Sequence, residues 1–140
     1  MKISARNQLT ATISAIDTGI VNVRISLMTS KGAKLTSVIT HTSAESMNLL
    51  KGDDVMAFFK ASHVMIATGH IDGISARNQL EGMIEKVTKG AVNTEVTLLL
   101  EGGEHIISII TNESAKELGL IPGQKAVAII KSTDIMIAKN

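Results

Sequence analysis

The sequence predicts a mainly β protein that consists of two tandem five-stranded barrels, each with one short helix. The first observation behind this fold class is a repeat. Ile3–Leu9 recurs letter for letter at Ile74–Leu80, and the offset of 71 residues (74 − 3 = 71) holds without a gap to the C-terminus, which indicates two copies of one module. The second observation is that β-branched residues recur in short runs broken by turn residues, as in strands joined by hairpins.

Each copy is expected to contain five strands, and the second strand shows the pattern most clearly. Val21, Val23 and Ile25 alternate with polar neighbours, which is the two-residue period of a half-buried strand. We expect the strands of the first copy at residues 9–16, 21–28, 34–40, 55–60 and 64–67, and those of the second at 83–87, 92–100, 105–111, 126–131 and 135–138. Within each copy the fourth and fifth strands are expected to go together.

One helix is expected after the third strand of each copy, at about residues 42–49 and 113–120. Thr42 with Glu45, and Ser114 with Glu117, have the spacing of a capping box. Five strands and one helix in about 70 residues suggest a compact barrel of the oligonucleotide- and oligosaccharide-binding (OB) type. The predicted division is a first module at 1–69, a short linker at 70–73 and a second module at 74–140.

Composition narrows the class of protein. Hydrophobic residues make up 44% of the chain and aromatic residues 1%, so the core must be aliphatic. Cysteine is absent, which excludes disulfides and thiolate metal sites, and modules this small usually need association to be stable. No run approaches the roughly 20 apolar residues of a membrane span, and the first motif follows Met1 and Lys2 directly. These features predict a cytoplasmic protein without a membrane partner.

Two functional classes are disfavoured by the same reasoning. A net charge of +1, with no Trp, no Tyr and only two Phe, gives little of the basic field or the stacking platform that single-stranded nucleic acid needs. The histidines do not repeat, because His41 aligns with Asn112 and His63 with Asp134. The chain also lacks a nucleophile elbow, a P-loop, a dinucleotide fingerprint and metal-ligand spacing. We therefore expect neither nucleic-acid binding nor catalysis, and no cofactor.

The residues that do repeat are donors of hydrogen bonds, and this pattern favours an oxyanion ligand. Hydroxyls repeat at Ser4/Ser75 and Thr40/Thr111, a guanidinium at Arg6/Arg77, and an ammonium at Lys60/Lys131. Ser43/Ser114 stands at an expected helix start, and each copy has a glycine turn followed by asparagine. Each element also has a structural interpretation, as a helix cap, a hairpin closure or a solvated charge at a strand end.

These motifs, in this order and in both copies, resemble the molybdate-binding Mop family, the molbindins, in its tandem two-module form. The resemblance rests on Ser-Ala-Arg-Asn, the Gly-x-Val-Asn turn, Thr-x-x-Ser-Ala, and Lys followed by Ala or Ser, and it covers Ile3–Ala67 and Ile74–Ala138. It implies OB-like barrels, binding of molybdate or tungstate without catalysis, and sites at module interfaces. It also implies an assembly of six modules, which for a tandem chain is a homotrimer.

The resemblance also implies which residues line the sites. Ser4, Arg6 and Lys60 on one side, with Thr40 and Ser43 on the other, would form one kind of site. The full first-copy set is Ser4, Ala5, Arg6, Asn7, Thr40, Ser43, Ala44, Lys60 and Ala61, and the second-copy set is Ser75, Ala76, Arg77, Asn78, Thr111, Ser114, Ala115, Lys131 and Ser132. A further kind of site, near the symmetry axis, would use Gly19, Ile20, Val21 and Asn22, and Gly90, Ala91, Val92 and Asn93.

The copies differ from the family pattern at a few places. Ala61 stands where the second copy has Ser132, so the first set lacks one hydroxyl, and Ile20 replaces the usual alanine of the turn. The predicted function is binding of molybdate or tungstate for intracellular molybdenum storage and homeostasis. The alternative is an oxyanion-sensing regulatory module that acts on a partner protein, and the sequence leaves the preference between the two anions open.

Overall fold

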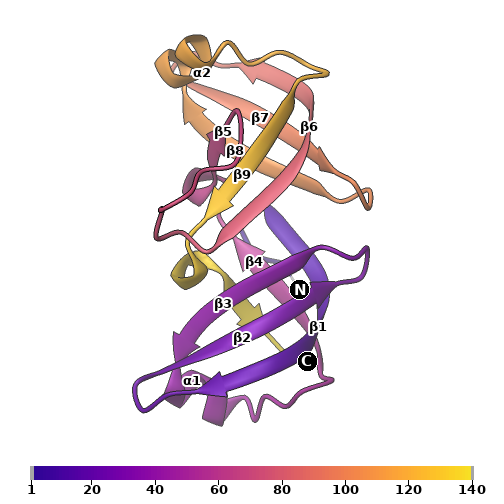
Figure 1. Ribbon diagram of the computed structural model, residues 1–140, viewed down its shortest axis with the longest axis vertical. Helices are drawn as coiled ribbons and strands as arrows, with labels where there is room; N and C mark the ends of the chain where they lie inside the picture. The colour runs from indigo at the N-terminus through magenta and orange to yellow at the C-terminus, as the bar shows by residue number, and fades with distance from the viewer. Residues whose placement is uncertain (1, 140) are drawn as a thin grey trace.

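The structure is a computed structural model that describes residues 2–139, and within that range it contains two antiparallel five-stranded sheets and two short helices (Figure 1). The mainly β class, with five strands per sheet and one helix per copy, is confirmed. The first copy supplies β1 (Asn7–Thr18), β2 (Asn22–Thr29), β3 (Lys34–Thr40), α1 (His41–Ser46), β4 (Asp54–Phe59), a 3₁₀ turn η1 (Ala61–His63) and β5 (Met65–Ala67). The second supplies β6 (Asn78–Lys89), β7 (Asn93–Leu100), β8 (His105–Thr111), α2 (Asn112–Leu118), β9 (Lys125–Ile130), η2 (Ser132–Asp134) and β10 (Met136–Ala138).

The fifth strands of the two copies are exchanged. One sheet has the order β10-β4-β1-β2-β3 and the other β5-β9-β6-β7-β8. Met136 pairs with Phe58 of the first copy, and Met65 pairs with Ile129 of the second. Figure 1 shows β5 beside β9 in the upper half and the yellow β10 in the lower half. The expectation that the fourth and fifth strands of one copy go together is wrong, and each half is completed by the other copy.

Each sheet curls because its central strand is long and carries a bulge. β1 pairs with β4 through its first half and with β2 through its second. The pairing with β2 shifts register between Ile13 and Ala15, and the matching shift in β6 lies between Ile84 and Lys86. A bulge bends a strand and increases its twist. The curled sheet therefore turns one face inward, and its alternate residues fill the core.

The core is aliphatic, as the composition predicts. Val23, Ile25 and Leu27 are at most 2% exposed, and Leu98 and Ile106 of the second half are completely buried. Most of the buried apolar residues of the two halves form one continuous cluster. Burial of apolar surface is the main favourable term in folding, so the halves are stabilised together.

Both helices begin one residue earlier than the sequence indicates. Thr40 and Thr111 are the N-caps, and their side chains accept a hydrogen bond from the amides of Ser43 and Ser114. The predicted capping boxes at Thr42 and Ser114 are therefore wrong, because the last residue of the preceding strand already caps each helix. The first helix is the shorter one and ends at Ser46.

Two buried serines donate hydrogen bonds across the joint between the halves. Ser37 donates a hydrogen bond to the Ile135 carbonyl at 2.6 Å, and Ser108 donates to the Val64 carbonyl at 2.6 Å. The offset of 71 relates these two contacts (37 + 71 = 108; 64 + 71 = 135), so the halves meet with pseudo-twofold symmetry. Lys139, beyond β10, contacts Asp53 of the first copy at 2.9 Å, at the end of β4 that lies away from this joint. Among residues 2–139, no helix is long and apolar enough to cross a membrane.

Candidate functional site

The repeated Ser-Ala-Arg-Asn motif leads into the long central strand of each sheet, and its side chains alternate in direction. Ala5 and Asn7 are 4% and 2% exposed, whereas Ser4 and Arg6 face solvent. The second copy has the same arrangement, with Ala76 and Asn78 buried and Ser75 and Arg77 exposed. The motif therefore has an inward pair and an outward pair, and the outward pair carries the hydroxyl and guanidinium donors.

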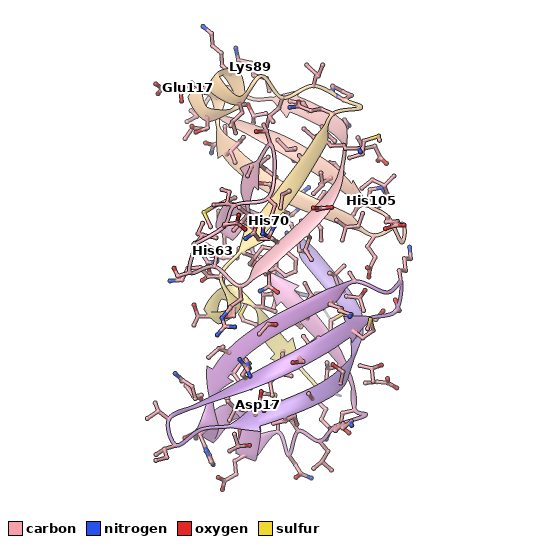
Figure 2. The ribbon with its side chains drawn as sticks, in the orientation of Figure 1. Asp17, His63, His70, Lys89, His105 and Glu117 are labelled. Carbon is pink, nitrogen blue, oxygen red and sulfur yellow. The ribbon has the colours of Figure 1, made fainter. Side chains whose placement is uncertain are left out.

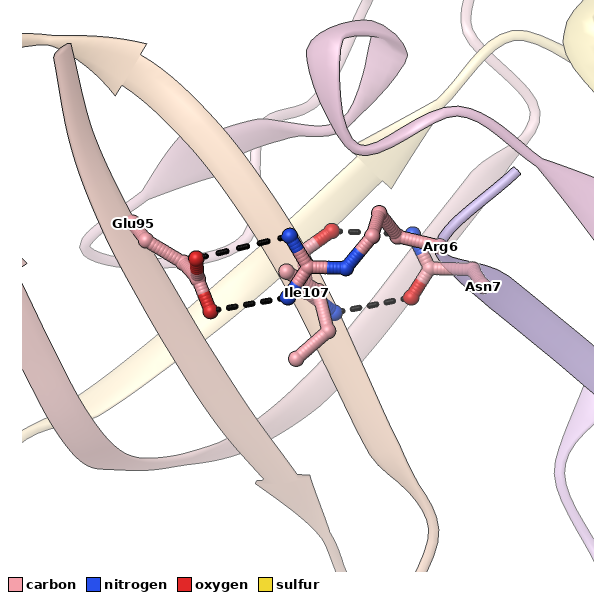
Figure 3. A network of polar contacts seen from close by, with 4 residues as sticks. All are labelled: Arg6, Asn7, Glu95 and Ile107. Atoms are coloured by element: carbon pink, nitrogen blue, oxygen red, sulfur yellow. Dashed lines mark hydrogen bonds and ion pairs between the residues drawn. The ribbon is translucent and has the colours of Figure 1, made fainter. Parts of the chain in front are cut away.

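The buried asparagines bind backbone of the opposite copy. Asn7 Nδ2 donates to the Ile107 carbonyl at 2.9 Å, and Asn7 Oδ1 accepts from the Ile107 amide at 2.8 Å (Figure 3). Asn78 makes the matching pair with Thr36 at 2.8 and 2.7 Å, and also donates to the Ile130 carbonyl at 3.2 Å. β8 and β3 are the outer strands of their sheets. The amides thus satisfy polar groups on two strand edges, and sequence reasoning, which placed them near the ligand, missed this role.

The two arginines have different surroundings. Arg6 forms a two-pronged contact with Glu95 on β7, with Nη2 3.0 Å from Oε1 and Nη1 3.5 Å from Oε2 (Figure 3). The side chains of this pair are 49% and 38% exposed. Within residues 2–139, no ion pair involves Arg77. A guanidinium with this geometry matches a carboxylate or a similar oxyanion.

Lys60 and Lys131 stand at the end of the fourth strand of their copies, and both are exposed. The residue after each one opens a 3₁₀ turn that packs against the third strand of the other copy: η1 against β8, and η2 against β3. Ala61 is 3% exposed, whereas its counterpart Ser132 is half-buried. The lysines therefore lie at the joint between copies. From the sequence, this position was implied only by the resemblance to the Mop family.

The structure brings the helix start and the glycine turn of one copy together. Asn22 is the cross-strand partner of Thr40, and Asn93 is the partner of Thr111. A pocket of about 410 Å³ is lined by Asn22, Thr40 and Ser43, and by Thr133, Ile135, Met136 and Ile137 from the other copy, together with apolar residues of β3 and α1. The prediction had assigned the turn and the helix start to different kinds of site.

Some hydroxyls of this group already serve the helix. Thr40 Oγ1 accepts from the Ser43 amide at 3.1 Å and donates to Ser43 Oγ at 2.8 Å, and Thr111 and Ser114 repeat both contacts. Ala44 lines a different pocket, against Ile16 and Thr18, as Ala115 does in the second copy. No hydrogen bond in the described chain joins Arg6 to Thr40 or Ser43. Their predicted grouping into one site stays a prediction.

The glycine turns are closed hairpin ends. The Gly19 amide donates to the Asn22 carbonyl at 2.9 Å, and a Cβ at Gly19 would lie 2.7 Å from that oxygen. Gly90 repeats both features with Asn93. The turn residues between them project outward: Ile20 is 97% exposed, Val21 71% and Val92 72%, and Ala91 is exposed as well. Glycine is required here because the chain approaches itself closely.

A further pair of equivalent residues was missed because its members differ chemically. His41 Nδ1 lies 3.0 Å from the Gly19 carbonyl, and Asn112 Nδ2 donates to the Gly90 carbonyl at 3.0 Å. Their alignment under the repeat, with a donor in both side chains, was the available signal. The other histidines do not gather at one place, and Figure 2 shows His105 apart from His63 and His70. His63 and His105 each approach a carboxylate, at 3.8 and 3.1 Å.

The chemistry of the exposed repeated residues is that of anion recognition. Arg6, Arg77, Lys60 and Lys131 carry positive charge, and Ser4 and Ser75 add exposed hydroxyls. Within residues 2–139, no three His, Cys, Asp or Glu side chains gather as a metal cation would require. The pKa of the Asp53 carboxyl is below its ordinary value, because the Lys139 ammonium and then the Leu50 amide donate to it. Asp53 lies just before β4 and belongs to neither donor set.

Comparison with known proteins agrees with the repeat. A family model described as the TOBE domain matches residues 3–66 and 74–137. The molybdenum-pterin-binding protein MopA of Rhodobacter capsulatus is 42% identical over 139 residues, which are 99% of this chain and 52% of that protein. The molybdenum transport protein ModE of Azotobacter vinelandii is 38% identical over 138 residues, which are 99% of this chain and 51% of that protein. The chain thus spans about half the length of these curated relatives.

A solved structure agrees over the full length. The cytoplasmic molybdate-binding protein ModG, in a crystal form with molybdate bound, matches with a TM-score of 0.94 and 43% sequence identity, and the match covers 100% of both chains. The resemblance to tandem Mop modules is confirmed by these relatives. Because the TOBE model matches each copy from Ile3 and Ile74 almost to its last strand, the chain belongs to the TOBE-domain family and carries two TOBE domains in tandem.

Proposed function

We propose that this protein binds molybdate or tungstate as an intact oxyanion and serves intracellular molybdenum storage and homeostasis. The observation that carries the proposal is the full-length match to a molybdate-bound protein, at a TM-score of 0.94 and 43% identity. The exposed donors Ser4, Arg6 and Lys60, repeated as Ser75, Arg77 and Lys131, supply the chemistry. The protein acts as a binding protein and not as an enzyme, in the cytoplasm, and it needs no cofactor, nucleic acid or membrane.

The donor set suits a tetrahedral dianion. Molybdate carries no proton at neutral pH, so it can only accept hydrogen bonds, and a site for it must offer N–H and O–H groups. A guanidinium provides two parallel donors, and an ammonium provides a mobile point charge. Hydroxyls and amides add donors without full charge neutralisation, which keeps binding reversible. Capture and release then require no covalent step.

The sites are completed in a homotrimer of six modules. In a single chain Arg6, Thr40 and Lys60 are all exposed, so none of them encloses an anion without further surface. The turn residues Ile20, Val21 and Val92 are more than two-thirds exposed, and apolar side chains in this position are typical of a contact between chains. In the assembly, Thr40 and Ser43 of one chain face Arg6 and Lys60 of another.

Isothermal titration with molybdate, tungstate, sulfate and phosphate tests the proposal, with the mass in solution measured alongside. We expect tight binding of the first two anions, weak binding of the others, and a mass near three times the 14.8 kDa of one chain. Arg77→Ala should weaken molybdate binding, whereas Lys86→Ala, an exposed charge on the bulged part of β6, should leave it unchanged. A folded assembly that gives no heat with molybdate contradicts the proposal.

A regulatory role is the second candidate, and a specific observation favours it. The chain corresponds to about half of the molybdenum transport protein ModE of Azotobacter vinelandii. A module of this kind can be the sensing part of a larger system, so the chain would bind an oxyanion and then a partner protein. Affinity capture with and without molybdate distinguishes the two. A partner retained only with the anion favours the regulatory module, and capture of the same proteins in both conditions favours storage.

A further inference from the structure

The two arginine sites of one chain are related by the pseudo-twofold symmetry but differ in charge. Arg6 and Arg77 correspond under the offset (6 + 71 = 77), and so do the backbone contacts of the asparagines that follow them, Asn7 with Ile107 and Asn78 with Thr36. The strand positions opposite the two arginines therefore also correspond. Glu95 occupies one of them, and Arg24 occupies the other (24 + 71 = 95).

Glu95 engages Arg6 in the geometry that an oxyanion would use. Its two carboxylate oxygens lie 3.0 and 3.5 Å from the two terminal nitrogens of the guanidinium (Figure 3). Both side chains are partly exposed, at 49% and 38%, so solvent and an anion can reach the pair. An incoming dianion must therefore either displace the Glu95 carboxylate from Arg6 or bind beside its negative charge.

Among residues 2–139, no carboxylate engages Arg77 in this way. Arg24, at the matching position, turns toward Asp17 on the neighbouring strand, with Nε 3.1 Å and Nη2 2.5 Å from Oδ2. Asp17 itself corresponds to the neutral Thr88 (17 + 71 = 88). At the matching position the Arg6 side therefore has a carboxylate that contacts the arginine, whereas the Arg77 side has a guanidinium whose charge is paired with Asp17.

We propose that Glu95 is an internal competitor for the anion at Arg6, and that the exchange of Glu95 for Arg24 makes the two arginine sites of each chain unequal in affinity. The Arg77 sites fill first, and the Arg6 sites fill only at higher anion concentration. Glu95 and Arg24 are positioning residues that act through the arginines and through the local field. This inference rests on the proposed function, because it assigns an order of filling to the same oxyanion sites.

The test is isothermal titration of the full chain with molybdate in three variants, each first checked for wild-type mass and thermal unfolding. Glu95→Gln should tighten the weaker class of sites by about three- to tenfold, because an exposed ion pair competes only modestly and the carboxylate also repels a dianion. Glu81→Gln is the matched control: it removes the same charge from an exposed position on β6 and should change neither class. The double variant Asp17→Asn/Arg24→Glu gives Arg77 the competitor that Arg6 has, and should weaken the tighter class.

The outcomes separate the inference from the proposed function. If the wild-type chain binds no molybdate, both the proposed function and this inference are refuted. If the wild type binds molybdate at equivalent sites, or if Glu95→Gln leaves the two affinities unchanged, the inference fails alone. Tightening by Glu95→Gln together with weakening by the double variant supports it.

Discussion

Asn78→Ala should destabilise the protein strongly, although the residue belongs to a motif that the sequence associates with ligand binding. Asn78 is 4% exposed and holds both the amide and the carbonyl of Thr36, at 2.7 and 2.8 Å. Removal of the side chain leaves these two groups of an outer strand without partners in a partly buried place. Each unsatisfied buried group costs about 1–3 kcal/mol, so we expect a loss of about 2–5 kcal/mol of unfolding free energy.

Urea unfolding followed by circular dichroism, at one fixed protein concentration, measures this loss. With a slope of about 2 kcal/mol per molar urea, the midpoint should fall by about 1–2.5 M. Gln8→Ala is the control, because Gln8 is an exposed amide whose hydrogen bond to the Ala5 carbonyl is local, and it should cost less than about 1 kcal/mol. Equal midpoints for wild type and Asn78→Ala would refute the assignment of this amide to the strand edge.

Two more predictions concern contacts between the two copies. Gly102→Ala should lower thermal stability by about 1–3 kcal/mol, because the new Cβ would meet the Lys31 carbonyl oxygen at 2.1 Å, whereas Gly69→Ala, with open space around it, should be nearly neutral. Asp53, whose pKa is lowered by Lys139, contributes stability that is present above the ordinary carboxyl pKa and is lost as pH falls through the lowered one. The stability difference between wild type and Lys139→Ala should thus shrink in acid, and a constant difference from pH 7 to 2 would contradict this.

The order of the strands along the chain could be predicted, but the partners of the two fifth strands could not. Both fifth strands have the same sequence, Met-Ile-Ala, at Met65–Ala67 and at Met136–Ala138. Either segment presents the same side chains to the fourth strand of either copy, so the local pattern does not state which one pairs with it. The choice is made by the short η1 and η2 turns, which direct the chain across the joint. The two-residue periodicity of a strand does not say which strand of the other copy it pairs with.

The site was predicted as a set of donors, and the structure divides that set by direction. The in-and-out alternation of β1 continues back through the Ser-Ala-Arg-Asn motif. It places Ala5 and Asn7 inside and Ser4 and Arg6 outside. The Thr40 cap was missed because the threonine ends a strand as well as beginning a helix. The Arg6 contact with Glu95 joins residues 89 positions apart, and no spacing rule reaches that far.

The exchange of β5 and β10 determines what a shorter chain can do. A chain that contains one copy alone would leave the edge of β4 unpaired, and its own fifth strand would have no place to go. An open strand edge of this kind recruits another chain, so a single module could complete itself only by pairing with a second molecule, at a rate that depends on concentration. Covalent connection of the two copies makes that encounter intramolecular. The 140-residue chain therefore behaves as a dimer of modules that cannot dissociate, because its two copies are covalently linked.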